Sequence, residues 1–112
     1  MRLIAVAGAL SGLLAVGFGA FGAHMIADPQ AKAWVATGAA YGLGHGVAAL
    51  WAEGREDGPG ALWAAGALLF SASLYALALG APRGAAMAAP AGGTLMLAGW
   101  GWLCLRLLTR RR

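Results

Sequence analysis

The chain alternates between long apolar runs and short polar connections. Four runs cover about residues 3–23, 31–52, 61–80 and 90–108. Each is close to the roughly 20 residues that an α-helix needs to cross a hydrocarbon layer about 30 Å thick. Strands of a membrane barrel would instead alternate in polarity over stretches of about ten residues. The pattern predicts an all-α, polytopic membrane protein: one domain over residues 1–112 that forms a compact bundle of four transmembrane helices.

The connections between the runs contain residues that favour turns. Asp28-Pro29 separates the first two runs, residues 53–60 separate the middle two, and residues 81–84 precede the last. All four acidic residues lie in these connections. Because each connection is short, consecutive helices are expected to be antiparallel neighbours.

Composition supports a membrane location and argues against a nucleic-acid partner. Hydrophobic residues make up 61% of the chain and charged residues 11%, with a net charge of +4. A soluble surface needs more polar side chains than this. Several basic residues, Arg106 and Arg110–Arg112, follow the last apolar run instead of forming a stripe with polar or aromatic partners. We therefore expect contact with membrane lipid and no binding of nucleic acid.

The distribution of basic residues predicts the orientation in the membrane. With four spans, both termini lie on one side together with Arg2, Arg55, Arg106 and Arg110–Arg112, whereas the other side holds only Lys32 and Arg83. Basic residues are enriched in cytoplasmic loops. The sequence thus predicts a multi-pass membrane protein with both termini in the cytoplasm.

The first run also has features of a signal peptide. Arg2 gives a basic start, an apolar stretch follows, and Ala20-Phe21-Gly22 offers small residues at plausible cleavage positions. However, the run of about 20 residues exceeds the usual apolar region of about 7–15. A first transmembrane helix is the favoured interpretation, with a signal peptide as the alternative.

Small residues recur at helical spacing in the first two runs. Such faces let helix backbones approach closely in lipid. They predict close packing within the bundle or a homo-oligomer interface, although alanine and glycine are so common here, 48 of 112 residues, that such patterns also arise by chance. The predicted helix-packing glycines are Gly8, Gly12, Gly19, Gly22, Gly38, Gly42 and Gly46.

Polar residues inside the runs define a candidate site. Thr37, Tyr41 and His45 recur at steps of three or four on the second helix. His45 and Ser11 lie at similar depths, roughly 10 and 12 Å from the same side, so the two side chains can meet. A histidine within a span is a functional candidate by default. The candidate intramembrane polar cluster is His45, Tyr41, Ser11 and Thr37; the alternative is a neutral imidazole that only supports helix association.

No metal or cofactor is expected. His24 and Trp34 are predicted at the outer interface, and His24 lies roughly 18 Å from His45 along the membrane normal. The two histidines therefore cannot hold one ion or haem within a monomer. A single cysteine, Cys104, excludes an internal disulfide and a cysteine-pair motif.

Several motifs together resemble the YgdD/YwdK family of small bacterial membrane proteins, a family of unknown function with a mitochondrial relative in animals. They are Gly-Ala-Phe-Gly-Ala-His at residues 19–24, Leu-Phe-Ser-Ala-Ser-Leu-Tyr at residues 69–75 and Pro-Ala-Gly-Gly at residues 90–93. The resemblance covers nearly the whole chain and implies four spans in an inner membrane, with no established activity. The motif residues are His24, Ser71, Ser73, Tyr75, Pro90, Gly92 and Gly93.

The sequence favours association over catalysis. Neither Ser71 nor Ser73 has a base or an orienting carboxylate nearby in the sequence, so no enzymatic activity is expected. We predict an accessory, assembly or oligomeric membrane component, acting in a homo-oligomer or a larger membrane complex. The alternative is an oligomeric transporter or channel for a proton or small solute that uses His45, Tyr41 and Ser11.

Overall fold

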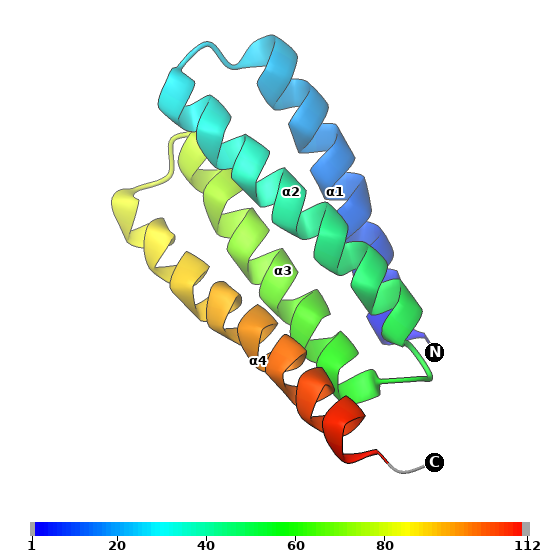
Figure 1. Cartoon of the computed structure of the whole chain (residues 1–112). Coiled ribbons are helices and arrows are strands. Elements are labelled where there is room, and N and C mark those ends of the chain that lie inside the picture. The colour runs from blue at the N-terminus through cyan, green and yellow to red at the C-terminus, as the bar shows by residue number, and fades with distance from the viewer. Residues whose placement is uncertain (1, 111–112) are drawn as a thin grey trace.

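The computed structural model describes residues 2–110 and contains four long helices joined by short connections (Figure 1). In chain order these are α1 (Leu3–Met25), α2 (Pro29–Ala52), α3 (Asp57–Ala78) and α4 (Ala88–Thr109), and a short 3₁₀ helix, η1 (Arg83–Met87), precedes α4. The all-α prediction is confirmed, because no strand occurs among the described residues.

The helix ends follow local chemistry. α2 begins at Pro29 because proline needs no backbone donor in a first turn, and the Asp28 carboxylate accepts a hydrogen bond from the Ala31 amide at 2.8 Å. α3 begins at Asp57, four residues before the predicted start, since Pro59 also falls in a first turn. It ends at Ala78, two residues before the predicted end, and Gly80 then takes φ +102°.

The helices form an open arrangement instead of the predicted compact bundle. α2 packs between α1 and α3, and α1 also reaches α3. α4 packs along α3, which leaves the side between α2 and α4 open (Figure 1). The start of α1, the α2–α3 connection and the end of α4 lie at the same end of the molecule.

Glycine sets the closest helix contacts. A Cβ atom on Gly46 of α2 would lie 2.7 Å from the carbonyl oxygen of Gly8 in α1, and one on Gly66 of α3 would lie 2.7 Å from the carbonyl oxygen of Gly92 in α4. Both are backbone atoms, which cannot move aside as the end of a side chain can. Any larger residue at these positions would force the helices apart.

Three helical segments, Leu3–Met25, Asp57–Ala78 and Arg83–Thr109, are long and apolar enough to cross a membrane. α2 is not among them although it has 24 residues. It is less apolar because it carries polar side chains, including Thr37, Tyr41 and His45. By length and composition, three of the four predicted spans are therefore supported.

Candidate functional site

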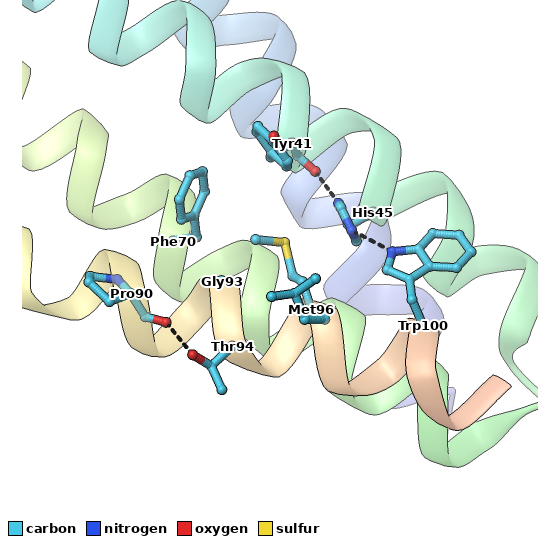
Figure 2. Close-up of a pocket in the computed structure, with 9 residues that line it drawn as sticks. Tyr41, His45, Phe70, Pro90, Gly93, Thr94, Met96 and Trp100 are labelled. Carbon is cyan, nitrogen blue, oxygen red and sulfur yellow. Dashed lines mark hydrogen bonds between the residues drawn. The ribbon is translucent and has the colours of Figure 1, made fainter. Parts of the chain in front are cut away.

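A groove opens between α2 and α4, with α3 as its floor (Figure 2). Its volume is about 450 Å³, within the range of about 300–1,000 Å³ that is usual for small-molecule sites. Aromatic and aliphatic side chains dominate the wall, with few polar groups. The lining residues are Tyr41 and His45 from α2, Phe70 from α3, and Pro90, Gly93, Thr94, Met96, Leu97 and Trp100 from α4.

A hydrogen bond joins α2 to α4 at one end of the groove. The indole Nε1–H of Trp100 donates to His45 Nε2 at 2.9 Å, and His45 Nδ1 lies 2.9 Å from the Tyr41 carbonyl oxygen (Figure 2). Because tryptophan can only donate, Nε2 must be unprotonated, so the proton of the neutral imidazole resides on Nδ1. Both ring nitrogens of His45 are therefore occupied.

The hydroxyl of Tyr41 is the polar group of the groove that is free to bind a ligand. Tyr41 is the thirteenth of the 24 residues of α2, and 49% of its surface is exposed. Its ring meets Phe70 edge to face, with centroids 5.2 Å apart. Within the described part of the chain its hydroxyl makes no hydrogen bond, whereas Thr94 already donates to the Pro90 carbonyl oxygen at 2.8 Å.

The structure divides the predicted polar cluster between two faces of α2. Ser11 is buried and donates to the Gly42 carbonyl oxygen at 2.7 Å, on the side that packs against α1. Tyr41 and His45 face α4 instead. Thr37 is exposed on α2. The partner of His45 is therefore Trp100, and the predicted contact between His45 and Ser11 is replaced, because the two side chains leave α2 and α1 toward different neighbours.

The serine and tyrosine motif of α3 is used in packing. Ser71 donates to the Gly38 carbonyl oxygen of α2 at 2.7 Å, and Ser73 donates to the Phe70 carbonyl oxygen of its own helix. Tyr75 is buried, and its ring stacks on the Phe18 ring, with the two centroids 4.2 Å apart. These contacts give both serine hydroxyls and the tyrosine ring a place in the core.

The remaining predicted residues fall into three groups. Gly22, Gly38 and Gly42 contact Val35, Tyr75 and Ser71 respectively, whereas Gly12 and Gly19 have looser surroundings. His24 is exposed in the last turn of α1, and Trp34 is half-buried in α2. Of the motif near the start of α4, Gly92 is buried against the backbone of α3, and Pro90 and Gly93 line the groove.

A second polar cluster ties the helix ends together near the start of α3. Glu56 is buried and forms ion pairs with Arg106, at 2.6 Å, and with Arg110. The hydrogen bond from Arg110, aided by that from Arg106 and by both positive charges, holds the pKa of Glu56 below its ordinary value of 4.5 against the effect of burial. This cluster fixes the end of α4 to the α2–α3 connection.

The other three carboxylates also have structural partners. Glu53 accepts a hydrogen bond from the Ala5 amide in the first turn of α1 at 2.9 Å, and Asp57 accepts one from the Gly54 amide at 2.7 Å. Asp28 caps α2, as described above. Each of the four carboxylates therefore stabilises a helix end or a connection.

Sequence reasoning missed Trp100, Phe70 and Glu56. Phe70 was noted only as part of the motif at residues 69–75, and only the placement of α4 shows that Phe70 and Trp100 both border the groove. A signal for Glu56 did exist, because an acidic residue before a helix and two arginines at the end of another can pair when both ends lie on the same side.

Helices of this length and hydropathy, with their charges at the ends, define the class as a small helical membrane protein. Residues 18–93 match the model of the family described as "Protein of unknown function (DUF423)". The chain belongs to this family, also named UPF0382, so the expected membership of the YgdD family is confirmed.

Relatives in bacteria and a yeast match along most of their length. The chain is 41% identical to a UPF0382 membrane protein of Haemophilus influenzae, over 82% of each chain. It is 33% identical to the UPF0382 inner membrane protein YgdD of Escherichia coli, over 99% of this chain and 93% of the relative. It is 35% identical to a UPF0382 membrane protein of Schizosaccharomyces pombe, over 82% and 90% respectively. No solved structure matches the chain significantly.

Proposed function

We propose that this protein is a non-enzymatic accessory component of the bacterial inner membrane that crosses the bilayer four times and acts by association. The main support for this proposal is that all four carboxylates are used at helix ends and connections. No carboxylate therefore remains within the proposed spans to act as a catalytic acid or base. The description of a relative as an inner membrane protein supports the location.

The packing of α2 supports the fourth span. α2 lies against both α1 and α3, and its connections to them are only a few residues long. If its two neighbours cross the membrane, α2 has to cross beside them. Its polar side chains then need protein partners more than those of the other helices do.

The charge distribution supports cytoplasmic termini. Arg2, Arg55, Arg106 and Arg110 belong to the end that holds the start of α1 and the end of α4, whereas Lys32 and Arg83 belong to the opposite end. Arg111 and Arg112, which the sequence analysis also assigned to the cytoplasmic side, lie outside the described residues.

Cysteine labelling tests this topology. Cys104 is first replaced by alanine, and single cysteines are introduced by Gly84→Cys or Thr109→Cys. A membrane-impermeant maleimide should label the cysteine at position 84 in intact spheroplasts and the one at position 109 only after lysis. Labelling of both in intact spheroplasts contradicts the proposed orientation.

A small-residue face of α2 is the proposed contact for a partner helix, with a second copy of the chain as the first candidate. Ala40 and Gly44 are exposed and, with Tyr41 and His45, line a hollow of about 350 Å³. A Cβ atom on Gly44 would meet nothing within 4 Å. A helix of another chain could therefore approach the α2 backbone closely there.

Association is tested with Gly44→Leu, because Gly42 packs against Ser71 and Ser11 inside the chain and its replacement would disturb the fold. After gentle detergent extraction, the protein mass of the particle without its bound detergent should exceed the 11.2 kDa of one chain, and Gly44→Leu should reduce it. The control is Gly17→Leu, since Gly17 on α1 also faces open space. Equal masses for both variants and the unchanged protein contradict association through this face.

Transport through the polar cluster has less support. A proton route needs exchangeable groups within hydrogen-bonding reach of one another, whereas Ser11 and His45 bond to different partners on different sides of α2. Proton flux in proteoliposomes that is abolished by His45→Ala would favour this alternative.

A further inference from the structure

We infer that the groove between α2 and α4 binds a membrane-soluble ring compound that carries a carbonyl oxygen, of the quinone class. The inference goes beyond the proposed association and does not depend on it, but it rests on the proposed fourth span, which places α2 within the membrane. It rests on the length of the groove, on the aromatic side chains that line it, and on the unused hydroxyl of Tyr41.

The dimensions of the groove favour a small molecule over a helix. Along α4 the lining extends from Pro90 to Trp100, which is about 15 Å at 1.5 Å per residue, and along α2 only from Tyr41 to His45. A transmembrane helix of a partner would need contact over about 30 Å and would be about 10 Å wide. A ring with part of an attached chain fits a groove of about 450 Å³.

The aromatic side chains of the groove lie at an unusual depth. Tryptophan and tyrosine prefer the two membrane interfaces, where their polar atoms reach water or headgroups. Tyr41 and Trp100 are instead each thirteenth in their helices, and both are about half-exposed. With Phe70 below them, they offer ring faces and edges to a flat ligand in the middle of the membrane.

The polar groups of the groove select the chemistry of the ligand. His45 and Trp100 satisfy each other, and Thr94 bonds within its own helix, so none of these three needs a ligand. The Tyr41 hydroxyl is a donor with no partner among the described residues, and in the middle of the proposed span it has no water to bond. A carbonyl oxygen would satisfy it, whereas an acyl chain would not.

The neighbouring side chains complete the proposed site. The hydrogen bond from Trp100 to His45 joins the two walls at one end and positions the indole ring. Met96 of α4 also lines the groove, where its flexible thioether can adapt to a ring. Gly93 leaves space, because a Cβ atom there would meet nothing within 4 Å.

The experiment measures binding of decylubiquinone to the full chain in detergent. Quenching of tryptophan fluorescence and a rise in melting temperature report binding, since a ligand of the folded state stabilises it. Decylbenzene, which has a ring and chain but no oxygen, is the matched probe. We expect saturable binding of decylubiquinone, and binding of decylbenzene that is at least about fivefold weaker, because one hydrogen bond is lost.

Two glycines of α4 provide a blocking variant and its control. Gly93→Leu places a side chain in the groove, whereas Gly101→Leu makes the same change on the same helix outside the lining, and both positions have open space. Gly93→Leu should weaken decylubiquinone binding more than tenfold, and Gly101→Leu should leave it unchanged. Tyr41→Phe, which removes only the hydroxyl, should weaken binding about fivefold to tenfold.

Several results would overturn the inference. These are equal affinity in the Gly93→Leu and Gly101→Leu variants, equal binding of the two probes, or unchanged binding after Tyr41→Phe. A protein that forms dimers, loses them on Gly93→Leu and binds no decylubiquinone would show that a second copy covers the groove instead. Failure of the association test at Gly44 leaves these expectations intact, so the two proposals can fail separately.

Discussion

The two sides of α2 show how differently a small-residue helix can be used. Toward α1 and α3, glycines bring backbones together, and buried serine hydroxyls donate to the carbonyl oxygens of Gly42 and Gly38. Toward α4, a hydrogen bond between His45 and Trp100 joins the two walls of an open groove. Small residues allow close approach, but whether a neighbour occupies that space depends on where the next helix packs.

The largest expected effect comes from Gly46→Leu on the closed side of α2. The new side chain would collide with the Gly8 backbone, so we expect a loss of about 1–3 kcal/mol or more in the free energy of unfolding. Circular dichroism during thermal unfolding in detergent measures it. Gly44→Leu, two residues away with open space, should leave monomer stability nearly unchanged. Equal melting temperatures for the two variants would contradict the proposed difference between the packed and the open side of α2.

The second effect concerns the ion pairs that hold the end of α4. Because the folded pKa of Glu56 is lowered, its ion pairs stabilise the protein fully above the unfolded pKa of 4.5, and this stabilisation is lost as the pH falls through the folded pKa. Glu56→Gln should therefore be less stable than the unchanged protein at pH 7, and the difference should shrink below pH 4.5.

Thermal unfolding of both proteins between pH 7 and pH 3 measures this difference. Arg55→Gln serves as the control, since it also changes a charge near this connection, while Arg55 bonds to the Trp51 carbonyl oxygen and not to Glu56. A Glu56→Gln difference that stays constant with pH would argue against the ion pairs as its cause.

A smaller effect is expected for the buried serines. Ser11→Ala and Ser71→Ala each remove a hydrogen bond to α2 and should each lower the free energy of unfolding by about 1 kcal/mol. Thr94→Val on the open side removes a hydroxyl that bonds its own helix, so it should have almost no effect. Unfolding in detergent distinguishes the three variants, and an equal loss in all of them would contradict the comparison.

The smallest effect is expected for Trp100→Phe, which deletes the donor to His45. Such interhelical hydrogen bonds average about 0.6 kcal/mol in membranes, and both groups here are partly exposed, so a loss of no more than that is expected. Faster amide hydrogen exchange in α4 would show the loosening of its contact with α2. Trp51→Phe is the control, because the Trp51 indole donates no hydrogen bond within the described residues, and the same acceleration in both variants would count against the contact.

Much of the fold was predictable because membrane helices are encoded locally. Apolar runs and turn residues indicated four helices with ends within four residues of the observed ones. The start of α3 was missed because Pro59 was interpreted as part of a connection, although the first turn of a helix tolerates proline. The prediction of a compact bundle was wrong for α4, which packs mainly along α3. Small-residue patterns indicate that a helix face can pack, but they do not indicate which helix packs on it.

The candidate site was only partly predictable for the same reason. His45 and Tyr41 were identified as rare polar residues in a span, but their partners Trp100 and Phe70 are distant in sequence, and nothing local indicates that they meet the two polar residues. Ser11 was grouped with His45 from its depth alone. Depth follows from the helical rise, whereas the direction in which a side chain points depends on how each helix is rotated against its neighbours.

The sequence by itself determined the all-helical class, the approximate helix ends, the placement of charges and the family, because each depends on residues close together in the chain or on the order of its motifs. Only the tertiary structure decided that Ser11 and His45 face different helices, that Glu56 holds the end of α4, and that a groove separates α2 from α4. These features depend on the relative rotation and position of whole helices, which long-range packing fixes and local periodicity does not.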